Sequence, residues 1–501
     1  MHNFRKGFFS STIRNSFKMN IHFITDTEGH LSSFIHSIKE SRVVRLDHED
    51  RLHFHSDIKD PYFIFGGDLT DRGTGDTKLT EMLLDFKQRN QDRVILLVGN
   101  REASKTRFLV ELNPRYIRER LVRGGAPFWL TSGPHQLPVD YVKKHMELSQ
   151  KAVNNLTDIE QHVESLDIEE CQLIYLKWML EQNLGCPHTF EYHRQQLAEK
   201  LDCKVMDISD SMILKSIMEQ TSPTGIVGEY IKQTQIAALI PEAGILAVHG
   251  GLTPENIGRL PAMLPTDPPI RDLQTWITQF NSWYKAEVAK WANLKHDEQT
   301  LELQPARSTL DTFSIRVPSE YRSIVTASML DHQRRFAEVP DFVSDYLRDN
   351  KIKLVLSGHQ PCGDYPALLR SKDDQVIFIN GDTSYANSKA GDVHNARGHA
   401  NHTLQVLVND HRHLQININA RLATGKLLEN CLEIIDDKVA DNSYIGKMLP
   451  GNELVQCLLE EPDYYRTIYQ EGFKVVYKFR TKLEIEDLLQ TNSIIPTLEY
   501  A

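Results

Sequence analysis

Cysteine, long apolar runs and excess positive charge are all scarce in this sequence. Its 501 residues include six cysteines, and none of them forms a C-x-x-C pair. This pattern fits neither a zinc ribbon nor a disulfide-dense secreted domain, and it favours a reducing compartment. No stretch approaches the roughly 20 consecutive apolar residues that cross a bilayer, so we expect no transmembrane segment. With 57 basic against 68 acidic residues the formal net charge is −11, which argues against general nucleic-acid binding.

The composition is that of a folded protein with more than one part. Hydrophobic residues make up 40% and charged residues 25% of the chain, as is usual for globular proteins. A chain of 501 residues exceeds what one core usually serves, so we expect a large catalytic domain with attached pieces. Residues 1–19 contain basic residues and serines but no acidic residue. We expect a disordered leader there, with an organellar presequence as the alternative.

Five short apolar runs each end in polar, glycine-rich residues. They span residues 21–25, 62–65, 94–98, 244–248 and 353–357. This pattern is typical of buried strands that deliver functional groups to the loop at their carboxyl end. Residues 79–88, between the second and third runs, have the apolar spacing of a helix with one buried face. Alternating strands and helices predict a layered α/β core.

Two further regions are predicted around this core. The stretch between Asn100 and His249 is far longer than a crossover needs and is mostly helical in pattern, which predicts a helical insertion at 140–235. Apolar runs at 376–379 and 403–408, and the alternating run 473–479, predict more strands. We therefore expect a catalytic domain over residues 20–410 and a C-terminal α/β extension over residues 411–501.

The ends of the predicted strands supply a set of metal ligands. Two divalent ions a few Å apart need a bridging carboxylate, further oxygen or imidazole ligands, and a position for water. Taken singly, an Asp after a strand more often caps a turn or a helix, so the ordered set carries the prediction. One ion would take Asp26, Glu28 and Asp68, and the other Asp68, Asn100, His249 and His359, with Asp68 as the bridge.

These blocks resemble the calcineurin-like metallophosphoesterases, and within them the phosphoprotein phosphatase family. The family pattern G-D-x-H-G, G-D-x-x-D-R-G, G-N-H-E, H-G-G and a later His corresponds to residues 25–29, 67–73, 99–102, 249–251 and 358–359. The resemblance implies a metallophosphatase β-sandwich flanked by helices, which hydrolyses phosphate monoesters through a metal-bound hydroxide. It also implies that the six residues above bind two metal ions, that Arg72 binds phosphate and that Asp71 orients a general acid. Tyr385 either matches an aromatic residue beside the family's active site or lies in an ordinary turn.

Two positions depart from the family pattern. Glu28 stands where the family has a metal-binding His, so the first site is all oxygen and favours hard ions. We expect Mn²⁺, with Mg²⁺, Fe and Zn²⁺ as alternatives. Arg101 replaces the catalytic His, and a guanidinium that stays protonated cannot protonate a leaving alkoxide. A phenoxide, whose conjugate acid titrates near about 10, needs less help. We therefore expect a preference for phosphotyrosine, with Arg101 binding phosphate; His30 is either a substitute acid or a packing residue.

Other interpretations stay open at this point. The altered blocks, the insertion and the C-terminal extension resemble the Wip effector phosphatases of Legionella, which implies a bacterial effector secreted into a host cell; otherwise a cytoplasmic location is expected. A Ser/Thr phosphatase or nucleotide phosphohydrolase of the same fold is one alternative function. A catalytically weak, metal-binding pseudophosphatase is another. The expected partners are a phosphoprotein substrate and proteins that bind the insertion, whose removal is expected to spare small aryl phosphates.

Overall fold

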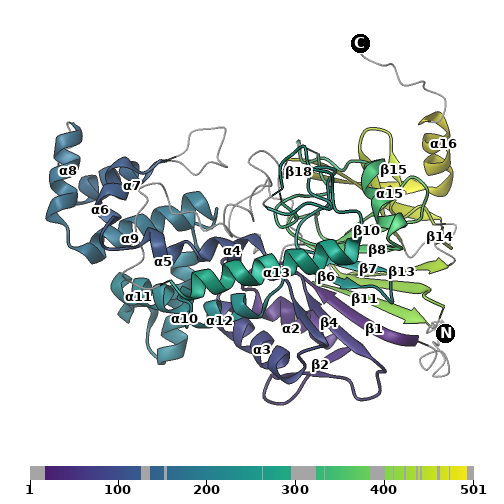
Figure 1. Ribbon diagram of the computed structural model, residues 1–501, viewed down its shortest axis with the longest axis horizontal. Helices are drawn as coiled ribbons and strands as arrows, with labels where there is room; N and C mark the ends of the chain where they lie inside the picture. Colours follow the sequence, from purple (N-terminus) through teal and green to yellow (C-terminus); the bar gives the residue numbers. More distant parts are fainter. Residues whose placement is uncertain are drawn as a thin grey trace, which may run out of the picture.

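Two β-sheets packed face to face form the centre of the computed structural model (Figure 1). The structure describes residues 17–492 apart from 126–135, 152–154, 262, 295–322, 332, 384–400, 410, 423–424, 436–437, 441–442, 460–462 and 473. The first sheet has the order β14-β13-β12-β11-β1-β4-β5. Its strands are β1 (Phe17–Ile24), β4 (Pro61–Phe65), β5 (Val94–Leu96), β11 (Asn401–Asn409), β12 (Leu414–Arg421), β13 (Leu427–Ile435) and β14 (Lys438–Val439).

The second sheet has the order β6-β7-β8-β10-β9. Within it β7, β8 and β10 are parallel, as β1, β4 and β5 are in the first sheet. The carboxyl ends of each parallel group therefore meet at one edge, where loops can combine their side chains. Its strands are β6 (Ala237–Ile240), β7 (Ile245–Val248), β8 (Leu354–Ser357), β9 (Ala367–Arg370) and β10 (Ile377–Asn380).

The core between the sheets follows from the alternation of apolar and polar residues. In β12, Leu414, Ile416 and Ile418 are buried against the second sheet. The residues between them face the other way, because successive side chains of a strand point to opposite faces. The parallel strands β7 and β8 are buried along their whole length, as expected for strands covered on both faces. This confirms the predicted strands at 21–25, 62–65, 94–98, 244–248, 353–357, 376–379 and 403–408.

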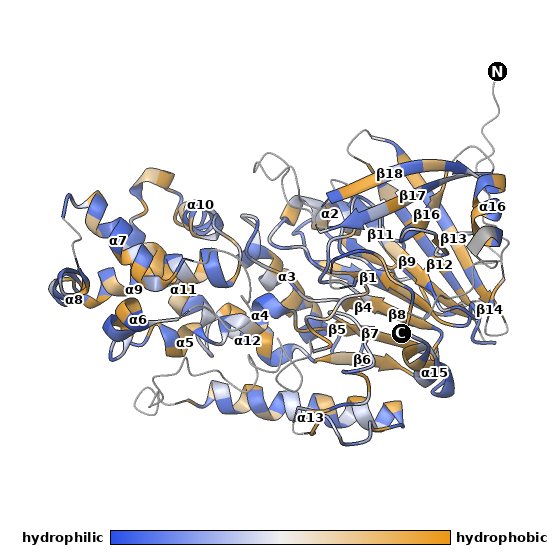
Figure 2. Cartoon of the chain, turned by 90° about the horizontal axis from the view of Figure 1, so that it is seen from above, coloured by the Kyte–Doolittle hydropathy of each residue, from blue (hydrophilic) through white to orange (hydrophobic). Residues whose placement is uncertain are grey.

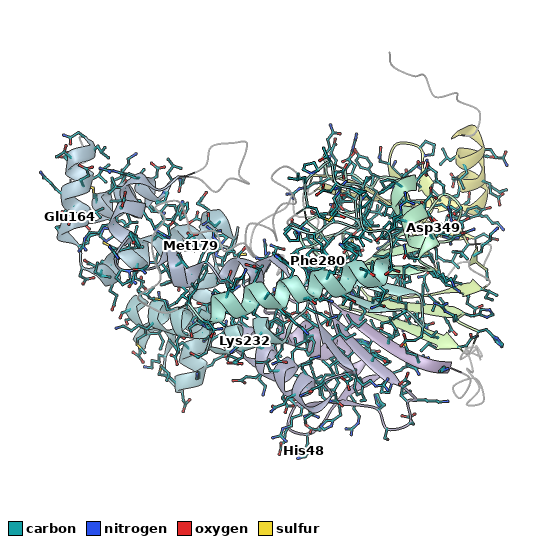
Figure 3. All side chains as sticks on the ribbon, viewed as in Figure 1. His48, Glu164, Met179, Lys232, Phe280 and Asp349 are labelled. Atoms are coloured by element: carbon teal, nitrogen blue, oxygen red, sulfur yellow. The ribbon has the colours of Figure 1, made fainter. Side chains whose placement is uncertain are left out.

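Helices cover the outer faces of both sheets. On the first sheet lie α2 (Leu31–Lys39) and α3 (Asp76–Arg89), whose Phe34 and Phe86 share a core with Phe63 of β4. On the second lie α13 (Leu273–Ala292) and α15 (Asp341–Asp349). Trp276 and Phe280 of α13 are fully buried, and Figure 3 labels Phe280 on this helix. A small hairpin of β2 (Val44–Leu46) and β3 (Leu52–Phe54) precedes β4. The expected α/β sandwich flanked by helices is thus confirmed.

The insertion is a helical body at one end of the molecule (Figure 1), with its own apolar core from Phe108 to Ile217. It begins earlier than the expected residue 140. Seen from above, its helices carry both apolar and polar residues, as mutually packed amphipathic helices do (Figure 2). The helices of this region are α4 (Asn100–Lys105), α5 (Phe108–Glu111), α6 (Ile117–Arg123), α7 (Pro138–Leu148), α8 (Leu156–Ser165), α9 (Ile168–Trp178), the π-helix η1 (Met179–Asn183), α10 (Thr189–Leu201), the 3-10 helix η2 (Val205–Asp207), α11 (Asp210–Thr221) and α12 (Ile226–Gln233).

The C-terminal part is divided differently from the expected boundary. A boundary at residue 410 would cut the hairpin of β11 and β12, in which Val406 pairs with Ile416, so the sandwich continues to Val439. Only the segment after it forms a separate sheet, of order β15-β16-β17-β18, with helix α16. These elements are β15 (Met448–Leu449), β16 (Glu453–Leu458), β17 (Tyr464–Glu471), β18 (Lys474–Thr481) and α16 (Lys482–Asn492).

Some expectations fall outside the described residues. The expected leader covers residues 1–19; residues 1–16 lie there, as does Tyr385, whereas residues 17–19 already belong to β1. Within the described ranges, no helix combines the length and apolar character needed to span a bilayer.

Replacing Ile416 by Ala tests whether β12 belongs to the core of the sandwich. Ile416 is 0% exposed, so its truncation should lower the free energy of unfolding by about 2–5 kcal/mol. Asn417→Ala, at the next position on the outward face, should change it by less than about 1 kcal/mol. Urea denaturation followed by circular dichroism measures both variants. Equal effects would place β12 outside the core.

Candidate metal and phosphate site

The ends of β1, β4, β7 and β8 bring most of the predicted site residues to one edge of the sandwich. Asp26 and Asp68 follow β1 and β4, while His249 and His359 follow β7 and β8. Backbone hydrogen bonds join these loops: the amide N of Asp26 donates to the Gly67 carbonyl over 2.9 Å, and that of Gly358 donates to the His249 carbonyl over 2.7 Å. The amide N of His359 donates to both carboxylate oxygens of Asp26 over 3.0 Å. The two sheets therefore share one site.

Several of the site residues have a left-handed backbone. Their φ angles are +51° at Asp26, +46° at Glu28, +53° at Asp68, +96° at Asp71 and +72° at His359. A non-glycine residue adopts this region rarely, and it persists only where the surroundings enforce it. Such strained positions cluster at functional sites.

Glu102 is the residue that holds two of these loops together. Its buried carboxylate accepts hydrogen bonds from the backbone N–H of Asp68 (3.0 Å), Leu69 (2.7 Å) and Gly99 (2.9 Å). Gly67 lies in the same junction with φ of +98°, and a Cβ there would lie 2.6 Å from the Gly99 nitrogen. The sequence block around residue 99 contains Glu102, but its role becomes visible only in the structure.

Four predicted ligands lie close enough to bind one divalent ion. Ligand atoms of Asp68, His249 and His359 lie within 4.8 Å of one another. The side-chain oxygen of Asn100 is 2.8 Å from His359 Nδ1 and 3.3 Å from His249 Nε2. His249 Nδ1 donates to the Gly66 carbonyl over 2.7 Å, which leaves Nε2 as a lone-pair donor beside Asp68. A carboxylate, an amide oxygen and two imidazoles fit a Mn²⁺-type or Zn²⁺-type ion.

The electrostatics of this group also suit a cation. Burial alone would lower the pKa of His249, but the negative charges of Asp68 and Asp26 raise it to about 10. Burial raises the pKa of Asp26 well above its usual value, and nearby Asp382 adds to the effect. Burial would also raise the pKa of Asp68, but its contacts with His249 and Arg101 hold it well below the usual value. Converging carboxylates of this kind are stabilised by a bound positive charge.

Glu28 does not join this group in the structure. Its Oε1 accepts a hydrogen bond from Arg101 Nη2 over 2.6 Å and lies 3.2 Å from Arg72 Nε. Among the described residues, the cluster of potential ligand atoms contains neither Glu28 nor Asp26. In the expected first metal site, Glu28 therefore forms ion pairs with the guanidinium groups of Arg72 and Arg101. The family resemblance implies a metal ion at this position.

Arg101 lies at the centre of the predicted phosphate site. It is 6% exposed, and its Nε lies 3.4 Å from Asp68 and its Nη1 3.9 Å from Asp71. Burial would lower its pKa, but Cys186 and the carboxylates of Glu28, Asp68 and Asp71 raise it well above the usual value. Arg101 therefore stays protonated, as expected from the sequence.

Asp71 is neutralised by Lys105, a residue that sequence reasoning missed. Lys105 Nζ donates to Asp71 Oδ2 and to Thr70 Oγ1, both over 2.6 Å. The Asp71 backbone N–H donates to the carboxylate of Asp76, whose pKa burial and Asp71 raise to about 8. Lys105 lies one helical turn after Arg101 on α4, so both side chains lie on the same face of the helix. This i,i+4 spacing is the sequence pattern that could have predicted Lys105 as a site residue.

His30 lies at the N-terminus of α2, where its amide N donates to the Thr27 carbonyl over 2.8 Å. Its possible part as an acid stays a prediction.

One turn of the insertion contacts three catalytic candidates. The Gly185 carbonyl accepts a long hydrogen bond of 3.4 Å from Arg72, Arg101 Nη1 donates to the Cys186 sulfur, and Thr189 Oγ1 donates to the Asp71 carbonyl over 2.6 Å. No local sequence pattern marks this turn, because it is 85 to 118 positions from its partners. This geometry argues against the expectation that removing the insertion spares small aryl phosphates.

Comparison with known proteins finds a family similarity over part of this chain. Residues 19–204 match the family model of the calcineurin-like phosphoesterases. This segment is less than half of the chain and contains the first three motif blocks and part of the insertion, so the chain is similar to the calcineurin-like phosphoesterases over these residues. No curated protein matches the sequence.

One solved structure that the chain matches is a protein serine/threonine phosphatase from Saccharomyces cerevisiae, described as similar to human phosphatase PP5. The alignment covers 86% of this chain and 83% of that chain, at 11% identity and a TM-score of 0.31. A likeness this loose says nothing about substrate.

Removing the Cys186 thiol tests whether the insertion positions Arg101. Cys186→Ala should lower kcat/KM for a small aryl phosphate about tenfold, since a hydrogen bond to a charged group is lost. Cys186→Ser should restore most of the loss, because the hydroxyl can accept the same bond. The control is Cys203→Ala, at an exposed cysteine of the same insertion. Equal activity of the Ala variants in a steady-state assay would remove Cys186 from this role.

Proposed function

We propose that this chain is a metal-dependent phosphatase of phosphate monoesters that prefers aryl phosphates such as phosphotyrosine. The observation that carries the proposal is the environment of Asp71. Its carboxylate is bound by Lys105 and faces Arg101, and no histidine in the described part of the chain hydrogen-bonds to it. The site is therefore built to hold negative charge, and it has no imidazole where the family resemblance implies a proton donor.

Arg72 and Arg101 are the residues that would bind the phosphoryl group. Both approach Glu28 at the edge of the ligand cluster, and a planar guanidinium donates two parallel hydrogen bonds to phosphate as it does to carboxylate. A phosphate would compete with the Glu28 carboxylate for these donors. A divalent ion bound at Asp68, Asn100, His249 and His359 would polarise a phosphoryl oxygen and lower the pKa of a water molecule.

The leaving group decides the specificity in this proposal. Arg101 stabilises charge on the phosphoryl oxygens but does not release a proton, because its pKa is raised well above the usual value. An alkoxide from phosphoserine needs a proton to leave, whereas a phenoxide leaves with less assistance. The site should therefore discriminate by the chemistry of the ester as well as by shape.

The preference can be measured with matched phosphotyrosine and phosphoserine peptides. We expect at least about a tenfold higher kcat/KM for phosphotyrosine, equivalent to roughly 1.4 kcal/mol. Arg101→His should narrow this ratio by restoring an acid beside Asp71, while Arg101→Ala should weaken both substrates. Arg123→His, at an exposed position of α6, is the control. Equal turnover of both peptides by the unaltered protein would contradict the proposed specificity.

One observation favours a second candidate, a catalytically weak metal-binding protein. The Glu28 carboxylate forms ion pairs with Arg72 and Arg101. If these ion pairs replace the first metal ion, the chain binds a single ion at Asp68, His249 and His359. A Ser/Thr phosphatase would require the same site with a different leaving group, and the peptide assay above tests it. A nucleotide phosphohydrolase would instead hydrolyse nucleotides in the same assay and neither peptide.

Metal content separates the two candidates. Chelation should abolish hydrolysis and Mn²⁺ should restore it best, with two ions per chain by elemental analysis. Asp68→Ala should lose both ions and all activity, whereas Glu28→Ala should retain at least the ion beside His249. One ion per chain and no turnover in the Mn²⁺-loaded protein would favour the weak metal-binding protein.

A further inference from the structure

A cavity lies on the outer face of the first sheet, away from the metal ligands. Its volume is about 380 Å³, within the usual range of small-molecule sites. The floor is formed by β1, β11, β12 and β13, and one wall is formed by residues 41–43 and 55–58, which flank the β2–β3 hairpin. Asn20 lines it six residues before Asp26, so the cavity lies about 20 Å along β1 from the site described above.

Amide side chains dominate the floor of this cavity, which we call the amide pocket. They lie on the outward face because the residues between them face the sandwich core. Gln405 of β11 pairs laterally with Asn417 of β12, which places the two amides side by side. The outward amides of the floor are Asn20, Gln405, Gln415, Asn417 and Asn419; Asn430 of β13, whose Oδ1 accepts a hydrogen bond from the Leu458 amide N, also lines the cavity.

Several of these amides lack protein partners. Gln405 is 4% exposed, yet its side chain makes no hydrogen bond to any described residue, and the same is true of Asn419. Gln415 donates to Asn417 over 3.2 Å, which satisfies only part of either group. The polar atoms of these amides are not among the fully buried unpaired atoms of the described residues, so they face the open cavity, where water can bind them. A ligand in the cavity can therefore hydrogen-bond these amides in place of water.

The remaining lining residues narrow the class of ligand. Arg42 is the only lysine or arginine among the described lining residues, and Asp57 and Glu429 oppose it, so the pocket does not select a phosphate or another polyanion. It also contains no Phe, Tyr or Trp among those residues, and a nucleobase usually needs such a surface to stack on.

We propose that the amide pocket binds a neutral polyhydroxylated ligand, namely an unphosphorylated monosaccharide or disaccharide. Each amide offers a carbonyl oxygen and an NH₂ group, which match hydroxyls that both donate and accept hydrogen bonds. Val43, Ile58 and Leu407 provide an apolar surface for the C–H face of a sugar ring. This site is independent of the proposed phosphatase activity.

The experiment screens the full chain against unphosphorylated mono- and disaccharides by saturation-transfer NMR, with nucleosides and sugar phosphates as competing classes. At least one neutral sugar should bind saturably, and Asn417→Ala and Asn419→Ala should each weaken it at least about tenfold. Gln274→Ala, at an exposed amide on α13, is the matched control and should leave binding unchanged.

Three results would overturn the proposal: no neutral sugar binds, binding is unchanged in both floor variants, or nucleosides or sugar phosphates bind in preference. Circular dichroism checks that each variant is folded. Asn419 is only half-buried and has no partner in the described protein, so Asn419→Ala provides the test if Asn417→Ala misfolds. Because sugar binding is read without turnover, its failure is distinct from a failure of the phosphatase proposal.

Discussion

The carboxylate of Glu102 is the interaction on which the rest of the site depends. It accepts three backbone N–H groups from two separate loops, and these donors have no strand or helix partner to replace it. Burial and the neighbouring charge of Asp68 raise the pKa of Glu102. These hydrogen bonds fix the position of Asp68 relative to the start of α4. Asn100 and Arg101 are the first two residues of that helix, so their positions are fixed as well.

Arg101 connects this junction to the helical insertion. On one side its guanidinium faces Glu28, Asp68 and Asp71, and on the other it meets Cys186. Removing one partner of such a buried network leaves a charge uncompensated, which is why buried networks tend to act as a unit. The insertion is therefore a wall of the phosphate site, and it can still present surfaces to protein substrates.

The sequence could predict those parts of the structure that are determined by a pattern of neighbouring residues. Strand ends such as those before Asp68 and His249 were predictable because a buried strand followed by a glycine-rich turn is written in consecutive residues. The ion pairs of Glu28 and the contact of Cys186 were not predictable, since they join segments far apart in the chain. The boundary at residue 410 misplaced β12 because an antiparallel hairpin and the start of a new domain have similar local patterns.

The pairing of β1 has a consequence for how the chain folds. Ile21 lies beside Tyr62 on one side and beside Val406 on the other. One neighbour of β1 thus follows it closely in the sequence, whereas the other is synthesised much later. Contacts of such long sequence separation slow folding and leave strand edges exposed meanwhile. During synthesis, the growing chain must carry an unpaired edge of β1 until β11 emerges, and the loop with Asp26 reaches its final position only then. A chaperone that shields this edge would therefore act on the same strand that ends in the metal site.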